Sequence, residues 1–551
     1  MEGRKFHAVV PRRKQPLEFD TFRGLLDKVA ADRPHVPVFS TLDYQTGIAR
    51  FVMPKDLQLQ IEGLGTWLYE TGKHGKVIGL LGSNSYEWLL TFYSARYAGC
   101  VVLLLDRTAD LDNLKDQIVR SGCQDLIYSQ DVREKAEALS AETGASLTPF
   151  EALEGLVVKG RVLISEGKTA CLDLVQSGEE TAVIMFTSGT TGISKGVMLS
   201  SRNLLYNADC TSDSVNFAKD QVHFLPLNHI YALLAHFEAL INGKRLHICL
   251  NMRRMAADFQ EAKPELLCLV PLLVKNLYGL LWQAIRKQGD EEKVQKMILE
   301  NREKGNVTPA EKRKMFAPYL ALFGGRLETI ISGGAPLDVQ LIGGFADFGI
   351  TVQEGYGITE CSPVLAVNPD ELNKPGTVGL ALPGHEILIE NPNEEGIGEI
   401  CAKGPSVMQG YYHMEKETAE AMAGGWFHTG DLGFLDEDNY LTITGRLKNL
   451  IILSNGENVS PEELEAKFRT CEAINEVVVY EKDGRITAMI YPDSEFLALK
   501  GITDGEEYIR NFIGEYNKNA AATRQIGAVF FRDVPFEKTG SKKIKRTFEK
   551  L

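Results

Sequence analysis

The sequence lacks the cysteine spacing that indicates a metal-binding or disulfide-bonded scaffold. Its nine cysteines lie between Cys100 and Cys471, with no CxxC pair and no cluster of cysteines and histidines. We therefore expect neither a disulfide framework nor a structural zinc site. The cysteines are interpreted as reduced thiols, which are typical of proteins in a reducing compartment.

Long apolar runs are also missing. No stretch reaches the roughly 18 uninterrupted apolar residues that a transmembrane helix needs. The segment from Leu266 to Trp282 comes closest, but Pro271, Lys275 and Asn276 interrupt it. The start, MEGRKFHAVVPRRKQPLEF, is basic but has no apolar region of a secretory signal. We expect a cytoplasmic protein without a membrane-spanning segment.

The sequence also has no excess of basic residues over acidic ones. The 551 residues include 60 Lys and Arg against 74 Asp and Glu, which gives a net charge of −14. This charge argues against a general binder of the phosphate backbone, so no nucleic-acid partner is expected. Residues 538–551 are basic in contrast, which suits a polyphosphate site or peripheral contact with an anionic membrane.

The composition is that of a globular protein, and apolar runs alternate with amphipathic segments. KVIGLLG (76–82) predicts a buried strand, SYEWLLTFYSARYAG (85–99) a helix and CVVLLL (100–105) a second strand. Strand, helix and strand predict a parallel pair with a crossover helix. The polar stretch from Gln283 to Pro318 predicts an exposed helical excursion from the same domain.

After about Gly425 the pattern changes to shorter strands separated by turns. FLDEDNYLTI (434–443) and the segment around Asp483-Gly484 predict hairpins. PEELEAKFRTC predicts a helix with Pro461 in its first turn. We expect a large domain over residues 1–446, a small α+β domain over 449–551, and a hinge near 446–449.

The segment TSGTTGISKG follows an apolar strand from Ala182 to Phe186. Its glycines let backbone N–H groups converge on an anion, and its hydroxyls and lysine add donors and positive charge. A Walker sequence is absent, because Gly196 follows Lys195. The candidate triphosphate-binding residues are Thr187, Ser188, Gly189, Thr190, Thr191, Gly192 and Lys195.

Four further segments suit the rest of a nucleotide. ISGGAPL and GYGITE offer glycines for close approach of a flat ligand, an aromatic ring, a hydroxyl and a carboxylate suited to Mg²⁺. WFHTGDLG presents a carboxylate in a tight turn, and TGRLKNLI adds an arginine for ribose or phosphate. The candidates are Gly333, Gly334, Ala335, Tyr356, Gly357, Thr359, Glu360, Asp431 and Arg446.

Taken in order, TSGTTGISKG, ISGGAPL, GYGITE, WFHTGD, GRLKNLIILSNGENVSPEELE and KTGSKKIKR resemble the motifs of adenylate-forming enzymes. This superfamily includes acyl-CoA synthetases, peptide-synthetase adenylation domains and firefly luciferases. The resemblance spans about Thr21 to Lys550. The polar excursion and LPLNHIYALL resemble long-chain fatty acyl-CoA synthetases. The resemblance implies an α/β fold: a large multi-layer N-terminal domain with αβαβα-like subdomains, and a small mobile C-terminal α+β domain.

The resemblance also implies a reaction in two steps, with a carboxylic acid, ATP and coenzyme A as substrates and Mg²⁺ as the metal. A medium- or long-chain fatty acid attacks the α-phosphate of ATP, pyrophosphate leaves, and the thiol of coenzyme A takes the acyl group from acyl-AMP. Three alternatives remain open: an acyl-AMP ligase that loads a carrier protein, an aryl-CoA ligase, and a nucleotide-binding sensor without catalysis.

Roles for individual residues follow from the same resemblance. It places the β- and γ-phosphates at the loop from Thr187 to Lys195, adenine at Gly333–Ala335 and Tyr356, the α-phosphate at Thr359 and Mg²⁺ at Glu360. It places the ribose at Asp431 and Arg446, a mobile catalytic lysine at Lys543, the hinge at Lys448 and the gate of the acyl pocket at His229.

Some positions leave alternatives open or depart from the pattern. His229 also suits a plain helix cap. Lys542 stands where the family usually has glycine, Ser194 where proline is common, and Asn228 where relatives often carry an aromatic residue or histidine.

Overall fold

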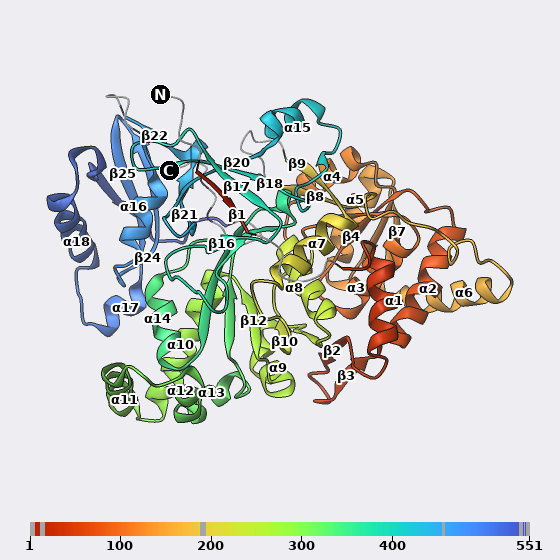
Figure 1. The fold of residues 1–551 in the computed structure, drawn as a ribbon, viewed down its shortest axis with the longest axis horizontal. Helices are drawn as coiled ribbons and strands as arrows, with labels where there is room; N and C mark the ends of the chain where they lie inside the picture. Colours follow the sequence, from red (N-terminus) through yellow and green to blue (C-terminus); the bar gives the residue numbers. More distant parts are fainter. Residues whose placement is uncertain are drawn as a thin grey trace.

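The computed structural model describes residues 6–10, 17–187, 194–453, 458–538, 544 and 546. These residues form three large sheets with covering helices, followed by a smaller α+β unit. Figure 1 shows this unit in blue, beside the green and teal strands of the central sheets. The described part of the chain is therefore mixed α/β, as predicted.

The first large sheet has seven strands in the order β19-β9-β8-β5-β4-β6-β7. Alternate residues of β5 pack on opposite faces: Val102 and Leu104 lie in one hydrophobic cluster, Leu103 and Leu105 in another. A parallel strand that is covered on both faces reads as a continuous apolar run, which explains CVVLLL. The strands are β4 (Val77–Leu81), β5 (Val101–Leu105), β6 (Asp125–Tyr128), β7 (Ser146–Pro149), β8 (Thr181–Thr187), β9 (Lys195–Ser200) and β19 (Gly410–Tyr411).

Helices from the first 211 residues pack around this sheet (Figure 1). Ser85 and Asp110 cap α3 and α4 through their side chains, as expected for residues that satisfy exposed N–H groups. The helices are α1 (Phe22–Asp32), α2 (Pro54–Glu70), α3 (Tyr86–Tyr97), α4 (Leu111–Ser121), α5 (Arg133–Thr143), α6 (Leu153–Ser165) and α7 (Ser201–Thr211).

The second sheet has nine strands in the order β16-β15-β14-β13-β12-β10-β11-β2-β3. Its six central strands, from β14 to β2, are parallel, so their carboxyl ends lie at one edge. The strands are β2 (Phe39–Leu42), β3 (Ala49–Val52), β10 (Gln221–His223), β11 (Leu246–Ile248), β12 (Leu266–Leu269), β13 (Thr329–Ser332), β14 (Thr351–Gly357), β15 (Val364–Val367) and β16 (Leu380–Ala381).

Seven helices accompany this sheet. The predicted excursion from Gln283 to Pro318 is helical, since it contains the end of α10, all of α11 and α12, and the start of α13. The helices are α8 (Ile230–Ile241), α9 (Met255–Ala262), α10 (Pro271–Lys287), α11 (Glu291–Lys304), α12 (Pro309–Met315), α13 (Ala317–Leu320) and α14 (Val339–Asp347).

The third sheet is antiparallel, with five strands in the order β1-β17-β18-β20-β21. The predicted hairpin at residues 434–443 is present as the connection of β20 and β21. The strands are β1 (Phe6–Val9), β17 (Glu386–Glu390), β18 (Gly398–Lys403), β20 (Phe427–Leu435) and β21 (Leu441–Arg446), with helix α15 (Glu415–Ala421) before β20.

The C-terminal unit has its own hydrophobic core, which includes Leu464, Phe468, Val477 and Ile490. The second predicted hairpin joins β24 and β25, and Asp483 and Gly484 have the positive φ angles that a tight two-residue turn requires. The elements are β22 (Ile451–Ile452), β23 (Asn458–Val459), α16 (Pro461–Phe468), β24 (Ile474–Lys482), β25 (Arg485–Pro492), α17 (Ser494–Leu499), α18 (Gly505–Asn519) and β26 (Ala528–Phe531).

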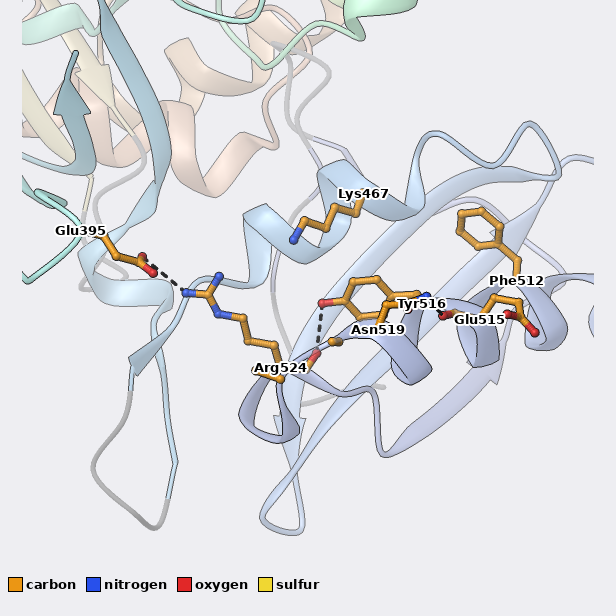
Figure 2. Close-up of a pocket in the computed structure, with 9 residues that line it drawn as sticks. Glu395, Lys467, Phe512, Glu515, Tyr516, Asn519 and Arg524 are labelled. Atoms are coloured by element: carbon orange, nitrogen blue, oxygen red, sulfur yellow. Dashed lines mark hydrogen bonds and ion pairs between the residues drawn. The ribbon is translucent and has the colours of Figure 1, made fainter. Parts of the chain in front are cut away.

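A hollow of about 770 Å³ lies where this unit meets the loop after β17 (Figure 2). Arg524 lines it and lies 3.6 Å from Glu395 of that loop and 3.7 Å from Glu463 of α16. This arginine therefore links the small unit to the five-stranded sheet. None of the residues that line the hollow is a predicted site residue.

Two predicted absences can be compared with the structure. All nine cysteines are buried and none forms a disulfide. Within the described ranges, no helix is both long and apolar enough to cross a bilayer.

Candidate active site

Several predicted site residues follow the carboxyl ends of two neighbouring parallel strands. Gly333, Gly334 and Ala335 come directly after β13, and Tyr356 and Gly357 are the last residues of β14. Ligands of open parallel sheets bind in the crevice outside the carboxyl ends of the strands. The structure therefore brings the predicted adenine-lining segments together at that edge.

The glycine segment after β13 lies against the start of helix α8. A Cβ atom at Gly333 would lie 3.3 Å from the ring of Tyr231, and the Tyr231 hydroxyl donates to the Ile331 carbonyl at 3.1 Å. His229 occupies the N-cap position of the same helix, but its side chain makes no capping hydrogen bond. The structure thus gives no support to the plain helix-cap role, and the gating role stays a prediction.

Asp431 is the centre of a buried hydrogen-bonded group. Its side chain is 5% exposed, although it carries a carboxylate. The Tyr356 hydroxyl donates to Oδ2 at 2.7 Å, and Arg446 Nε lies 2.7 Å from Oδ1. A carboxylate has about four acceptor positions, so two remain for a ligand with paired hydroxyls such as a ribose.

Asp431 lies within strand β20 and pairs with Arg446 of β21, so the prediction of a tight turn is wrong. The Thr429–Asp431 segment is instead an irregularity in the pairing of β18 with β20, and β18 holds it in place. Thr429 Oγ1 donates to the Ile400 carbonyl at 2.7 Å, and the Gly430 N–H donates to Glu399 Oε1 at 3.0 Å. Gly430 has a φ of +69°, a conformation that side chains disfavour and glycine adopts readily. The threonine and the glycine of the TGD sequence therefore hold the backbone that positions Asp431.

Glu360 forms a second group with Tyr411 and Lys195. The Tyr411 hydroxyl donates to Glu360 Oε1 at 3.1 Å, and the Lys195 ammonium lies 4.7 Å from the centre of the Tyr411 ring. Burial raises the pKa of Glu360, while the Tyr411 hydroxyl and the Arg446 charge oppose the rise. A nearby divalent cation would favour the ionised carboxylate, and hard oxygen donors are the ligands that Mg²⁺ prefers. Glu360 therefore fits the predicted role of holding Mg²⁺.

Thr359 lies beside this carboxylate, at the start of a short 3₁₀ helix (Thr359–Cys361) after β14. Gly357 is constrained before that helix, because a Cβ atom there would lie 1.9 Å from the Pro363 carbonyl oxygen. The sequence GYGITE thus places Tyr356 in the Asp431 group and Glu360 in the Tyr411 group within five residues.

The predicted triphosphate loop is described only at its two ends. Thr187 ends β8 and Lys195 begins β9, and the two residues pair across these antiparallel strands. Ser188, Gly189, Thr190, Thr191 and Gly192 lie outside the described residues, and so do Lys542 and Lys543. Their predicted roles stay predictions.

Lys448 lies in a single 3₁₀ turn (Leu447–Asn449) between the five-stranded sheet and the C-terminal unit. Burial and then the charge of Arg446 lower the pKa of Lys448. Asn449 donates to Glu462 at 2.5 Å, and the Ser460 hydroxyl donates to the Thr444 carbonyl at 2.6 Å. These bonds join the two parts next to the predicted hinge, whose motion stays a prediction.

Two contributors were missed in the sequence. Tyr411 contacts both Glu360 and Lys195, although it lies in a segment with no nucleotide-binding signature. Glu399 of β18 accepts from the N–H of Gly430, next to Asp431 on β20. The residue order offers no signal for either contact, because each depends on which strands become neighbours.

The comparisons with known proteins agree with this geometry. A family model described as AMP-binding enzyme matches residues 50–412, and one described as AMP-binding enzyme C-terminal domain matches residues 448–549. This chain belongs to the AMP-binding enzyme family. The membership confirms the resemblance to adenylate-forming enzymes and the prediction that the chain is an enzyme.

Two curated relatives share less than a third of their aligned residues with this chain. Long chain acyl-CoA synthetase 7, peroxisomal, of Arabidopsis thaliana is 29% identical over 455 residues, covering 78% of this chain and 62% of the relative. The chain thus matches less than two thirds of that protein. Long-chain-fatty-acid–CoA ligase FadD15 of Mycobacterium bovis is 27% identical over 517 residues, covering 87% of this chain and 83% of the relative.

Solved structures confirm the fold. ATP-bound MatB from Rhodopseudomonas palustris has a TM-score of 0.75 at 25% identity, covering 94% of this chain and 96% of that one. Apo MatB from the same organism has a TM-score of 0.67 at 23% identity, covering 95% of this chain and 97% of that one. Both comparisons show that the chain has the fold of these enzymes.

Removing the carboxylate at position 431 tests the buried group. We expect Asp431→Ala to weaken ATP binding by about 1.5–3 kcal/mol, or roughly 10- to 150-fold in Kd, through the loss of charged hydrogen bonds. Isothermal titration calorimetry with ATP and Mg²⁺ measures this. Asp431→Asn, which keeps the shape, should lose affinity in the same direction. Asp438→Asn, at an exposed position of the β20–β21 turn, is the control. An unchanged Kd in both Asp431 variants would contradict the ribose assignment.

Proposed function

We propose that this protein is an ATP-dependent acyl-CoA ligase that activates a medium- or long-chain fatty acid through an acyl-AMP intermediate. The main observation behind the proposal is a pair of neighbouring groups, Tyr356–Asp431–Arg446 and Lys195–Tyr411–Glu360, to which three different sheets contribute. The first suits a ribose, and the second suits phosphates with their metal. Together they suit ATP.

The chemistry requires little beyond position and charge. A fatty acid carboxylate is a poor electrophile, and its oxygen must approach the α-phosphorus while pyrophosphate leaves on the opposite side. Holding the two reactants in this geometry and neutralising charge supply most of the catalysis in phosphoryl-type transfer. Mg²⁺ bound at Glu360 would neutralise phosphate charge. Asp431, Arg446 and Tyr356 would fix the nucleoside, and Thr359 lies next to Glu360 for the α-phosphate.

The second step joins the acyl group to coenzyme A. The thiol of coenzyme A attacks the acyl carbon, the carbon–oxygen bond to phosphate breaks, and AMP leaves as a good leaving group. In this proposal Lys543 reaches the α-phosphate and the carboxylate during the first step only. The C-terminal unit then turns about Lys448 and replaces that lysine with the coenzyme A site.

The choice of acid rests on the relatives. The curated relatives reported above are named long-chain synthetases and ligases. An acid with a long apolar chain is therefore the first candidate. The test below also decides whether the acid is aromatic and whether a carrier protein replaces coenzyme A as the acyl acceptor.

A ladder of acids tests the activity and its acceptor together. We expect pyrophosphate release with ATP and Mg²⁺ to be accelerated by coenzyme A and to peak at an acid of medium or long chain. The acids run from acetate to palmitate, with benzoate as the aromatic member. Release that coenzyme A does not accelerate would contradict the thiol acceptor. A maximum with benzoate would contradict the fatty acid, and no release with any acid would contradict the ligase.

The two half-reactions test the role of Lys543. We expect Lys543→Ala to slow acyl-AMP formation by about 100-fold or more, the usual effect of removing one electrostatic catalyst. Thioester formation from supplied acyl-AMP and coenzyme A should stay near the wild-type rate. Both rates are measured by rapid-quench chromatography.

Lys542→Ala is the matched control, because it removes the adjacent lysine and should leave both rates nearly unchanged. An equal loss of both half-reactions in Lys543→Ala would contradict the alternation of the C-terminal unit. A loss in Lys542→Ala alone would move the assignment to that residue.

A further inference from the structure

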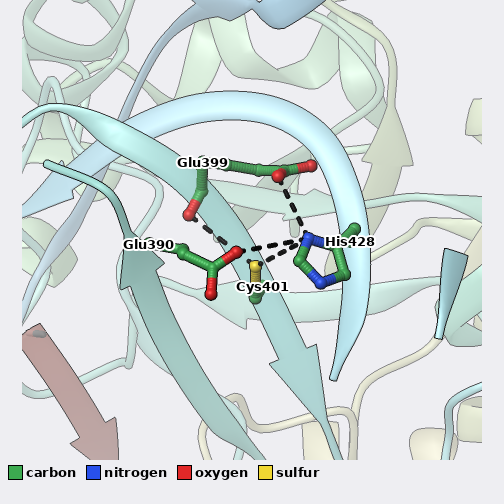
Figure 3. A group of neighbouring side chains, drawn as sticks. All are labelled: Glu390, Glu399, Cys401 and His428. Carbon is green, nitrogen blue, oxygen red and sulfur yellow. Dashed lines mark hydrogen bonds and ion pairs between the residues drawn. The ribbon is translucent and has the colours of Figure 1, made fainter. Parts of the chain in front are cut away.

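Four side chains of types that can bind metals meet on the five-stranded sheet, near Asp431 of β20. Glu390, Glu399, Cys401 and His428 each offer one donor atom, and these atoms lie within 4.8 Å of one another (Figure 3). We propose that these four side chains form a binding site for a zinc ion. The site is separate from Glu360 and from the nucleotide-binding group.

The register of the sheet produces this arrangement. Glu390 of β17 pairs with Glu399 of β18, and Cys401 of β18 pairs with His428 of β20. Residues two apart on a strand point to the same face, so Glu399 and Cys401 lie side by side. The residue between them, Ile400, is buried in the hydrophobic cluster of this sheet. The β17–β18 pair and the β18–β20 pair therefore share β18, and an irregularity of the β18–β20 register lies between Glu399 and Cys401. This arrangement brings the four donors together.

The spacing of the donor atoms suits a tetrahedral ion. His428 Nδ1 lies 3.0 Å from Glu399 Oε2, 3.4 Å from Cys401 Sγ and 3.7 Å from Glu390 Oε2. Zinc bonds of about 2.1 Å to nitrogen and oxygen and 2.3 Å to sulfur place tetrahedral ligand atoms roughly 3.4–3.6 Å apart. Small side-chain movements are sufficient to receive the ion.

A contact outside the cluster selects the ring nitrogen that binds. His428 Nε2 lies 3.2 Å from the carbonyl oxygen of Ala423. A carbonyl only accepts, so Nε2 carries a proton and Nδ1 is the nitrogen that faces the other donors. Histidines that bind metals usually donate the remaining N–H to a backbone carbonyl or a carboxylate, which fixes the ring. Ala423 would have this supporting role.

The charges of the site also favour a cation. Glu390 and Glu399 are directly opposite on antiparallel strands, where like charges destabilise the pair. Among the described residues, His428 is the ion-pair partner of both carboxylates. One imidazole thus pairs with two carboxylates and, when protonated, balances only one negative charge. A divalent ion would neutralise the second carboxylate.

The donor set determines which metal fits. A thiol and an imidazole beside two carboxylates match Zn²⁺, whereas Mg²⁺ prefers oxygen ligands alone. Binding would release the protons held by Sγ and Nδ1 to solvent, because metal ligands must be deprotonated. The side chains of Glu390, His428 and Glu399 are 28%, 21% and 19% exposed, so the ion can enter beside buried Cys401.

The proposal revises the expectation of no structural zinc site. The four ligands come from three strands, and no short spacing of cysteines and histidines joins them. A sequence search for zinc ligands relies on such spacing, whereas this site depends on register. Because Glu399 also accepts from the Gly430 N–H, a bound ion would help to hold the segment of β20 that carries Asp431.

Metal binding by the full chain, without a polyhistidine tag, tests the proposal. Protein treated with a chelator is dialysed against ZnCl₂ with excess Mg²⁺ and no nucleotide, and bound zinc is measured by mass spectrometry. We expect one zinc per chain and a rise in Tm. Cobalt(II) in place of zinc should give the near-ultraviolet absorption of a thiolate-to-metal transition.

Variants of the ligands separate the site from adventitious binding. Cys401→Ser, His428→Gln and Glu390→Gln should each raise the Kd for zinc about tenfold or more, and Cys401→Ser should abolish the cobalt–thiolate band. Cys471→Ser, a buried cysteine of the C-terminal unit, and His35→Gln, an exposed histidine, are the controls.

Circular dichroism confirms that each variant is folded, and Glu390→Gln, at the most exposed ligand, is the variant least disturbing to packing. If all three ligand variants bound zinc with the Kd of the wild type, the proposal would be overturned. Absence of stoichiometric binding in the folded wild type would also overturn it. Either failure leaves the proposed ligase activity unaffected, since that activity is measured separately.

Discussion

The buried carboxylate of Asp431 is the constraint on which the rest of the site depends. A charge removed from water is costly unless it is paired and hydrogen-bonded. Arg446 and Tyr356 meet that requirement, one from the adjacent strand of the same sheet and one from the last strand residues of the nine-stranded sheet. The interaction therefore links these two sheets, which also share a hydrophobic cluster.

The contacts of Tyr411 with Glu360 and Lys195 connect the seven-stranded sheet to the same site. Lys195 begins β9 of that sheet, Tyr411 lies on its edge strand β19, and Glu360 follows β14 of the nine-stranded sheet. Each sheet alone provides only part of the proposed nucleotide site. The three sheets together bring the residues proposed to bind base, ribose and phosphate into one region, and residues 447–449 connect it to the C-terminal unit.

Much of this could be predicted from the residues. Local signals predicted β4, α3, β5 and the hairpin at Asp483-Gly484, because apolar runs and turn residues act over a few positions. The candidates Tyr356, Glu360, Asp431 and Arg446 were found through ordered motifs, and the structure brings them together. Tyr411 and the pairing of Cys401 with His428 could not be predicted, because strand order and register decide those contacts. The roles of Lys543 and His229 stay predictions.

The central claim is that a carboxylate oxygen of the substrate attacks the α-phosphorus of ATP. The most direct test supplies a fatty acid with both carboxylate oxygens replaced by oxygen-18, together with ATP, Mg²⁺ and coenzyme A. One of the two oxygens bridges to phosphorus in acyl-AMP and remains on AMP when the thiol displaces it. The account predicts that each AMP contains one labelled oxygen by mass spectrometry. Labelled orthophosphate with ADP, or thioester formed beside unlabelled AMP, would contradict it.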